Sequence, residues 1–524
     1  MSDAELLVFD VGSTFTKVAA FCFEVDPPGR RLSYVGRAQS PTTVLDIEGG
    51  LALAQKALLE SGVDVSPGAR RFASSSAAGG LRMVALGYMP RVTVKAAKEV
   101  AMNAGARVLE VLSCDDSPAY RVEVLREIRP DIVLLTGGTD GGDSQSLPEN
   151  AKVVAEAARS VNKPGAATQP WEPVIILAGN REGQGPASDV LRQAGINFLR
   201  VPNILPTIHE LRVQPAREAI HAQFIRQITK APGLGRLTGL VEDGKVIPTP
   251  GAVLLGAELL AKGTHAQPGA GNLMVVDLGG ATTDIHSVIP DLEALSIEER
   301  GLVVSNEKQV SYRTVEGNLG LRVSACGIVE TLGARGVLSY GNQEALASAL
   351  GIESMNAEAW AELEERLNRF ALHLEAHPEK VVPEDHSLEA AFDTALAAAA
   401  VAVALRRHAG HIAAECNPVL GITPGMPMGR DTRMITTVFA VGGIFTHSSP
   451  ARSLWILERA FADPGLSLLP QKPSFIIDKN YLLYALGVLG DRHADAVLAF
   501  GKRHFNLPSA GACPATDYLK DKTA

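Results

Sequence analysis

The hydrophobic and polar positions of this 524-residue chain repeat one pattern at two places far apart in the sequence. The apolar runs Leu6–Phe9 and Leu273–Val276 are each followed by an aspartate (Asp10, Asp277), a glycine turn with hydroxyl residues, and a second apolar run. Short apolar runs bounded by turn residues are typical of buried strands. Each place therefore predicts a buried strand, a tight turn and a returning strand.

The rest of the pattern predicts a layered α/β protein. Strand-like runs at Arg71–Ser75, Ile132–Thr136 and Val174–Ala178 alternate with helical patterns such as Asn150–Ser160. Strands that alternate with helices are typical of a largely parallel sheet. Because residues from about 80 to 240 exceed what one half of the repeat requires, we interpret them as an inserted α/β subdomain.

The domain boundaries follow from the repeat. We expect an N-terminal half over residues 1–265, which contains the insertion, and a C-terminal half over residues 266–505. The second half contains a mainly helical insertion at about 340–416, in which the Ala-rich run Ala391–Leu405 predicts a packed helix. The tail, residues 506–524, has weak periodicity and is interpreted as partly disordered.

Composition narrows the class of function. The chain is 46% hydrophobic and 20% charged, and its formal net charge is −9, without a dense block of Lys or Arg. Nucleic acid and anionic membranes are therefore not expected as partners. Five cysteines lie far apart, which is neither a disulfide framework nor a zinc pattern. Because the chain has no basic N-terminal region and no apolar run of about 18 residues, we expect a cytoplasmic protein.

The two glycine turns carry residues suited to a phosphate and a metal ion. Glycine lets the backbone approach a ligand closely, and successive N–H groups and hydroxyls form a concave anion site. A carboxylate at the end of a strand is a hard oxygen ligand suited to Mg²⁺ or its waters. Taken alone, the turn in Asp10–Lys17 is equally consistent with a simple hairpin. Neither turn has the spacing of a Walker A motif or of a dinucleotide fingerprint.

A third glycine element follows later in the chain. The run Val438–Val441 predicts a buried strand, and Gly442 and Gly443 come directly after it. Two glycines at the end of a strand let a base and a ribose lie against bare backbone. Two phosphate loops followed by such an adenosine element resemble the ATPase fold of actin, Hsp70 and the sugar kinases. That resemblance implies two RNase H-like halves of duplicated topology, which face each other across ATP.

Longer motifs resemble one family within this superfamily. They are Thr136–Asp143, Ile247–Leu254, Val275–Val288, Glu316–Gly320 and Asp478–Tyr481. Together they are similar to the glutamate mutase (methylaspartate mutase) accessory proteins, called GlmL or MutL, which are unrelated to the mismatch-repair protein of the latter name. The resemblance implies an ATP-driven reactivating chaperone, with ATP and Mg²⁺ as cofactors and subunits of an adenosylcobalamin-dependent mutase as partners. Self-association is left open.

The same resemblance implies roles for individual residues. Asp10 would orient Mg²⁺ and its waters, and Asp277 would hold the second side of the metal or position the attacking water. Lys17 is either a catalytic cation or a solvated cation at a strand end. Contacts to phosphate or adenosine are implied for Gly12, Ser13, Thr14, Thr16, Gly279, Gly280, Thr282, Thr283, Gly442 and Gly443.

The glycine loop within Thr136–Asp143 is a further candidate. Gly137 and Gly138 either bind phosphate or belong to a flexible turn between a strand and a helix. The family pattern has Asn where this chain has Asp143, which leaves the role of that side chain open.

Other polar residues have two interpretations each. Glu316 either faces the terminal phosphate or caps a helix. His408 and His411 lie near the end of the Ala-rich helix, and we interpret them as surface residues rather than metal ligands.

Three other functions use the same fold. A small-molecule kinase requires a dedicated catalytic aspartate, which the sequence does not identify. An ATP-driven activator of a 2-hydroxyacyl-CoA dehydratase shares the first loop, but it requires cysteines for a bridging cluster, and Cys326 is the remaining candidate. A filament or scaffold protein of the actin class is the third alternative.

Overall fold

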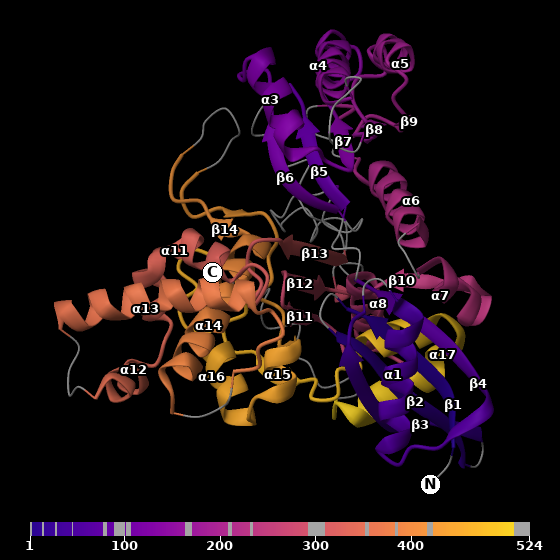
Figure 1. Cartoon of the computed structure of the whole chain (residues 1–524), viewed down its shortest axis with the longest axis vertical. Coiled ribbons are helices and arrows are strands. Elements are labelled where there is room, and N and C mark those ends of the chain that lie inside the picture. Colours follow the sequence, from indigo (N-terminus) through magenta and orange to yellow (C-terminus); the bar gives the residue numbers. More distant parts are fainter. Residues whose placement is uncertain are drawn as a thin grey trace. The chain divides into compact units, whose positions relative to one another are not determined.

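The computed structural model describes residues 3–12, 15–26, 29–43, 46–76, 81–88, 100, 106–162, 170–207, 212–230, 234–291, 310–351, 356–382, 386–416 and 423–507. The chain forms two compact units, whose elements are labelled in Figure 1. Unit 1 combines Met1–Ala77 with Arg236–Ala524, and unit 2 is Ala78–Gly235. The division of unit 1 into halves at residues 265 and 266 stays a prediction, and the tail beyond residue 507 lies outside the described residues.

A five-stranded mixed sheet begins unit 1. Its strand order is β10-β4-β1-β2-β3; β2 runs antiparallel to β1 and β3, whereas β4 runs parallel to β1 and β10. The strands are β1 (Ala4–Val11), β2 (Phe15–Asp26), β3 (Gly29–Pro41), β4 (Val65–Ser75) and β10 (Val246–Pro248). The predicted strand, turn and returning strand around Asp10 are therefore confirmed as the central hairpin of this sheet.

A second sheet in unit 1 repeats this topology. Its order is β13-β12-β11-β16-β17, with β11, β12 and β13 antiparallel and β11, β16 and β17 parallel. The strands are β11 (Leu273–Leu278), β12 (Thr283–Val288), β13 (Ser311–Glu316), β16 (Thr437–Val441) and β17 (Ser474–Ile477). Both hairpins that carry an aspartate thus occupy the same place in the same strand order, which confirms the duplicated RNase H-like topology.

Two helices, α8 (Thr249–Lys262) and α17 (Leu483–His504), pack against each other within one core that includes residues of both sheets. Their backbones approach closely at two glycines. A Cβ atom on Gly256 would collide with the main-chain oxygen of Leu483, and one on Gly487 with that of Ala252. Glycine at both positions therefore permits the contact between the helices.

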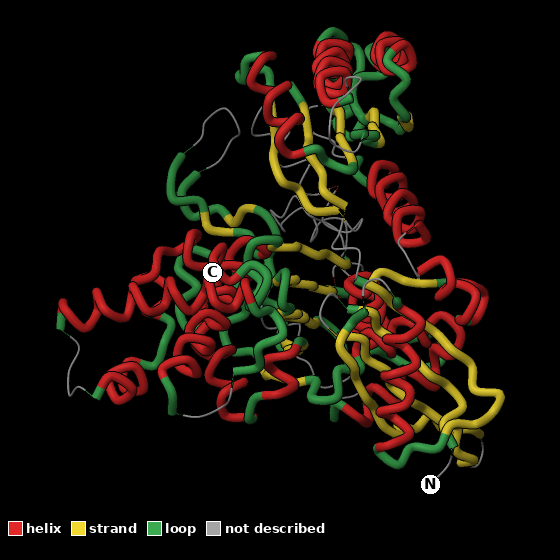
Figure 2. The backbone as a smooth tube through the Cα atoms, in the orientation of Figure 1, coloured by secondary structure: helices red, strands yellow, loops and turns green. Residues whose placement is uncertain are grey.

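The second sheet carries a largely helical layer, which Figure 2 shows in red over the region from α11 to α16. Its helices are α11 (Ala325–Ser339), α12 (Gln343–Leu350), α13 (Ala357–Ala376), α14 (Leu388–His408), α15 (Gly443–His447) and α16 (Pro450–Phe461). Helix α14 lies in the middle of the core cluster. By length and composition α14 could cross a membrane, but 78% of its most apolar stretch is buried inside the protein, which confirms the predicted packed helix.

Helix α1 (Ile47–Glu60) packs on the face of the first sheet opposite α17. Leu6 and Val8 of β1 face α17, whereas Phe9 of β1 lines a cavity with Leu51 of α1.

The remaining described elements of unit 1, together with α1, are short or peripheral. These elements are α1 (Ile47–Glu60), α7 (Leu234–Leu240, which begins at the end of unit 2), the 3₁₀ turn at Glu242–Gly244, β14 (His411–Ile412) and β15 (Pro427–Met428).

Unit 2 is a doubly wound parallel sheet. Its order is β6-β5-β7-β8-β9, and every pair of neighbours is parallel. The strands are β5 (Leu81–Leu86), β6 (Ala106–Leu112), β7 (Ile132–Leu135), β8 (Val174–Leu177) and β9 (Phe198–Arg200). The described helices are α3 (Pro118–Ile128), α4 (Ser146–Val161), α5 (Gln184–Gln193) and α6 (Gln214–Lys230).

Candidate functional site

The first glycine turn joins β1 to β2. The Gly12 N–H donates to the main-chain oxygen of Phe15 at 3.0 Å, and a Cβ atom on Gly12 would lie 2.7 Å from that oxygen. Thr42 donates to the Gly12 oxygen at 2.9 Å, and the hydroxyls of Thr42 and Thr16 lie 3.1 Å apart. Thr16 therefore supports the turn from inside the protein. Ser13 and Thr14 lie outside the described residues.

Asp10 ends β1 and is 1% exposed. Its Oδ1 accepts hydrogen bonds from Ser74 at 3.0 Å and from Thr249 at 2.5 Å. Its Oδ2 pairs with the ammonium of Lys17 at 3.2 Å, directly across the hairpin. These three donors satisfy the hydrogen-bonding capacity of a buried carboxylate.

Lys17 is not a freely solvated cation. Its side chain is 25% exposed, and its ammonium lies 3.7 Å from the centre of the Tyr481 ring as well as beside Asp10. A cation over an aromatic face is held by the negative potential of that face. The positive charge of Lys17 is thus fixed at the edge of the first turn.

The second glycine turn has the same hydrogen bond as the first. The Gly279 N–H donates to the main-chain oxygen of Thr282 at 2.9 Å, three residues on. The loop after β13 supports this turn, because the N–H of Leu321 donates to Gly279, and those of Arg322 and Val323 donate to Gly280. The hydroxyl of Thr283 donates inward to Leu319 at 2.6 Å and that of Thr282 to Asp284 at 2.9 Å.

Asp277 ends β11 and lacks the partners that Asp10 has. It is 9% exposed, and no hydrogen bond to its carboxylate comes from the described residues. Burial raises its pKa to about 7, and the negative charges of Asp284 and Asp10 act in the same direction, whereas the positive charges of Lys17 and Arg313 oppose the shift. Since charges from the first hairpin act on Asp277, the fold brings the two turns together.

Sequence reasoning missed the ion pair beside Asp277. Asp284 lies directly opposite Asp277 on β12, and Arg313 of β13 donates to its Oδ1 through Nε at 3.0 Å and Nη2 at 2.6 Å. The available signal was the spacing: Asp284 follows Asp277 by the same interval as Lys17 follows Asp10, so both lie across their hairpins from the strand-end aspartates.

The third glycine element lies beside the second turn. β16 pairs with β11 so that Val441 is opposite Asp277. Gly442 has φ +124°, and a Cβ atom on it would collide with the main-chain oxygen of Leu278. Gly443 begins α15 with open space around it. The structure therefore brings the second glycine turn and the third glycine element to one edge of one sheet.

A cavity of about 250 Å³ lies beside the first turn. It is lined mainly by polar side chains: Lys17, Arg37, Gln39, His447, Asn480 and Tyr481. Arg37 is half-buried, and its guanidinium forms no hydrogen bond or ion pair with the described residues. Burial lowers the pKa of His447, and the positive charges of Arg37, Lys17 and Lys479 lower it further. The cavity thus extends from Lys17 of β2 to His447 at the end of α15.

Gly137 and Gly138 lie in unit 2, in the loop between β7 and α4. Both have positive φ, and a Cβ atom on Gly138 would collide with the main-chain oxygen of Asp143. Asn180 and Asn203 donate to the main-chain oxygens of Thr139 and Gly138 at 2.6 and 3.0 Å. The loop is therefore fixed by side-chain hydrogen bonds from Asn180 and Asn203.

Asp143 has a structural role in this loop. Its carboxylate accepts from the N–H groups of Gln145 and Ser146 at 3.0 and 3.4 Å, at the start of α4. A carboxylate there occupies the position that an anion would take at a helix N-terminus.

The interpretation of His408 as a surface residue is wrong. His408 is 2% exposed, and its ring nitrogens lie 2.7 Å from Ser287 Oγ and 3.0 Å from Thr314 Oγ1. His411 is exposed, as expected.

Glu316, a further candidate, accepts a hydrogen bond from Arg407 at 2.5 Å. Among the described residues, no group of three His, Cys, Asp or Glu side chains could hold a metal ion.

Two sheets of identical order, each with an aspartate and a glycine turn in its central hairpin, define the actin-like ATPase fold. A family model described as MutL protein matches residues 6–505. Protein MutL of Clostridium tetanomorphum is 36% identical over 509 residues, which cover 96% of this chain and 99% of that protein. The chain belongs to the MutL protein family.

Two solved structures are similar over most of their length. The activator of the 2-hydroxyisocaproyl-CoA dehydratase from Clostridium difficile, with bound ADPNP, is 8% identical and has a TM-score of 0.26, covering 97% of this chain and 99% of that one. Glycerol kinase from Plasmodium falciparum, with ADP, is 8% identical with a TM-score of 0.32, covering 95% and 93%. At these TM-scores neither alignment supports an inference, and the fold rests on strand order and register.

Proposed function

We propose that this protein is an ATP-hydrolysing accessory protein that reactivates an adenosylcobalamin-dependent mutase, such as glutamate mutase, in the cytoplasm. Membership of the MutL family supports the link to the mutase. The main observation in support of ATP hydrolysis is the environment of Asp277. Its carboxylate is nearly buried and accepts no hydrogen bond from the described residues, and the charges of Asp10 and Lys17 on the opposite hairpin act on it.

The residues present fit Mg²⁺. The carboxylate of Asp277 has free lone pairs and little water around it, and a cation is the natural partner of such a group. The oxygens of Asp10 already accept from Ser74, Thr249 and Lys17, so Asp10 would act on waters of the ion. When bound, the ion supplies positive charge to the phosphate oxygens. It would also lower the pKa of Asp277.

The protein's own groups would do the remaining work. Asp277 would position the attacking water, because its carboxylate accepts no hydrogen bond from the described residues. Lys17 would stabilise negative charge on the phosphates. The turns at Gly12 and at Gly279–Gly280 would position the phosphates from opposite sides, because hydrolysis of ATP depends mostly on positioning and charge.

The cavity between Lys17 and His447 would hold the nucleoside. It begins beside the proposed phosphate contacts and ends at α15, which starts at the proposed adenosine element Gly442–Gly443. Arg37 and Gln39 present polar groups there. A base and a ribose need such donors and acceptors for orientation.

A dehydratase activator is the weaker alternative. Burial, together with Glu375, raises the pKa of Cys326 to about 11. An iron–sulfur cluster binds thiolates, and a raised pKa disfavours the thiolate. For a small-molecule kinase, the other enzymatic alternative, the described residues offer no observation in its favour.

The test is ATP hydrolysis by wild type and Asp277→Asn, with and without an inactivated adenosylcobalamin mutase and fresh cofactor. We expect Mg²⁺-dependent hydrolysis and recovery of mutase activity in wild type, and loss of both in the variant. Asp463→Asn, at an exposed position, is the control. Hydrolysis without recovery of the mutase would refute the reactivating role, and absence of ATP binding would refute the whole proposal.

A further inference from the structure

Helix α14 carries one buried carboxylate, Asp393, in a largely apolar sequence. Asp393 is 2% exposed, and the helix around it is buried along most of its length. A buried charge is costly unless it is paired and hydrogen-bonded. Asp393 meets this requirement with two guanidinium groups, from Arg322 and Arg452, which reach it from different parts of the chain.

Arg322 connects Asp393 to the second phosphate turn. Its main-chain N–H donates to the Gly280 oxygen at 2.8 Å. Its side chain donates to Asp393 Oδ1 at 2.8 Å, to the Lys380 oxygen at 3.0 Å and to the Leu321 oxygen at 2.8 Å. The same residue therefore holds the turn with its backbone and the core helix with its side chain.

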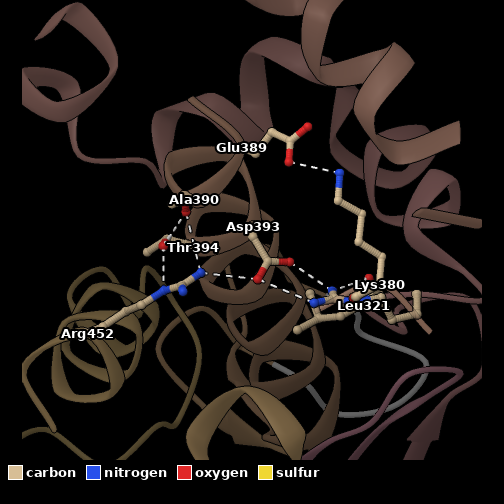
Figure 3. Close-up of polar contacts among 8 residues, drawn as sticks. Leu321, Lys380, Glu389, Ala390, Asp393, Thr394 and Arg452 are labelled. Atoms are coloured by element: carbon tan, nitrogen blue, oxygen red, sulfur yellow. Dashed lines mark hydrogen bonds and ion pairs between the residues drawn. The ribbon is translucent and has the colours of Figure 1, made fainter. Parts of the chain in front are cut away.

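Arg452 connects the same carboxylate to the adenosine element. It donates to Asp393 Oδ2 at 3.1 Å and to Thr394 Oγ1 at 2.9 Å, both on α14. Arg452 lies in the first turn of α16, which follows α15 after only Ser448 and Ser449. Figure 3 shows Arg452 directed at Asp393 and Thr394, with Leu321 on the other side of the carboxylate.

We propose that Asp393 is a positioning residue that couples the phosphate turn at Gly279–Gly280 to the α15–α16 segment through Arg322 and Arg452. This inference rests on the proposed function, because it assumes that both elements bind one nucleotide. One carboxylate between two guanidiniums fixes the distance between the elements. A ligand that orders one of them therefore orders the other, since the bonds on Asp393 have one mutually compatible geometry.

A purely structural triad makes a different prediction. It would stabilise the packing of α14 against α16 and the 321–323 loop, and its loss would lower the melting temperature without regard to the ligand. Coupling instead predicts that the loss of either arm lowers the affinity for ATP, which engages both elements, more than the affinity for adenosine. The Arg322 arm should affect ATP alone, whereas the Arg452 arm should also affect adenosine.

The experiment measures binding of ATP, ADP and adenosine to the full-length protein by titration calorimetry. For Arg322→Gln we expect ATP affinity to fall about tenfold while adenosine affinity is nearly unchanged. For Arg452→Gln we expect adenosine affinity to fall and ATP affinity to fall by a larger factor, because ATP also engages the phosphate turn that the broken arm no longer aligns. Asp393→Asn should show both losses, and the double variant Arg322→Gln with Arg452→Gln should lose no more than Asp393→Asn does.

Two controls keep the outcomes separate. Glu364→Gln breaks the partly exposed pair with Arg335, which lies between α11 and α13 and touches neither element. Arg322→Lys and Arg452→Lys keep the charge and lose the fork, so they test the coupling even where Asp393→Asn does not fold.

The outcomes are distinct. Changes in melting temperature with unchanged ratios of ATP to adenosine affinity, or changes equal to those of Glu364→Gln, would overturn the coupling while the nucleotide site stands. Wild-type protein that binds no nucleotide would overturn the proposed function and this inference with it.

Discussion

Asp277 and Asp284 lie directly opposite each other on β11 and β12, and Arg313 forms its ion pair with Asp284. Asp284 also accepts from Thr282, whereas Asp277 has no donor among the described residues. In the first sheet, the place opposite Asp10 is taken by Lys17. Two hairpins of one topology thus carry opposite charges at equivalent positions, and the uncompensated carboxylate is left at the proposed site of the metal ion.

Asp277→Asn should change the pH dependence of stability. The folded pKa of about 7 lies above the ordinary value of 3.8, so folded protein binds this proton more tightly than unfolded protein does. Stability from this group is present at low pH and is lost as the pH rises from about 4 to about 7. Without nucleotide, we expect the variant to be more stable than wild type above neutral pH, by at most on the order of 4 kcal/mol.

The measurement is denaturant unfolding of both proteins at several pH values, without and with Mg²⁺ and ATP. The two proteins should have equal stability in acid, and the ligands should stabilise wild type more than the variant. Parallel curves over the whole pH range would contradict the raised pKa of Asp277.

Arg313→Met should destabilise the fold strongly. Both members of the Arg313–Asp284 pair are buried, with side chains 6% and 5% exposed. Removing the arginine leaves a buried carboxylate next to Asp277, at a cost of about 3–5 kcal/mol in unfolding free energy. Chemical denaturation measures the change. Arg366→Met breaks an exposed ion pair with Glu362, which lies one helical turn away on the same helix. It should lower the unfolding free energy by less than about 1 kcal/mol.

Gly487→Ala should force α8 and α17 apart. The added Cβ would collide with the main-chain oxygen of Ala252, which cannot rotate away as a side chain can. We expect a loss of about 1–3 kcal/mol or more, together with weaker nucleotide binding, because the core between these helices joins both sheets. In Gly251→Ala of α8, the nearest atoms lie at 3.9 Å, so that variant should be neutral or stabilising. Equal effects would contradict the close contact.

Arg37→Ala should weaken nucleotide binding without weakening the fold. Arg37 lines the cavity and forms no hydrogen bond or ion pair with the described residues, so its loss breaks no such bond there. We expect the affinity for ADP to fall by about tenfold, the worth of one charged hydrogen bond. Arg31→Ala is the control for charge, since Arg31 lies on the same strand but pairs with Glu24 at the surface. Equal affinities of the two variants would place the nucleotide elsewhere.

Sequence reasoning recovered the two hairpins because each is specified locally. Apolar runs, strand-end aspartates and glycine turns occur within about fifteen neighbouring residues, and β1 and β11 lie where those runs were found. Gly442 could be predicted for the same reason. Its close approach to Leu278 requires a glycine, and a glycine directly after an apolar run can be recognised in the sequence.

The charged partners were not accessible in this way. Asp393 is 71 residues from Arg322 and 59 from Arg452, so no local pattern connects them. His408 was misjudged because α14 is apolar on nearly every side, and its periodicity therefore does not distinguish a buried face from an exposed one. The partners of a charged residue within a buried segment can therefore be identified only from the folded structure.

The strands β4 and β10 are neighbours in the first sheet, with Ala73 opposite Val246 and Ser75 opposite Pro248. All of unit 2 lies between them in the sequence. The sheet thus closes at the same two strands whatever chain connects them, as is common where domains are inserted. The strand order that holds Asp10 at the end of β1 therefore does not depend on the length of the chain inserted between β4 and β10.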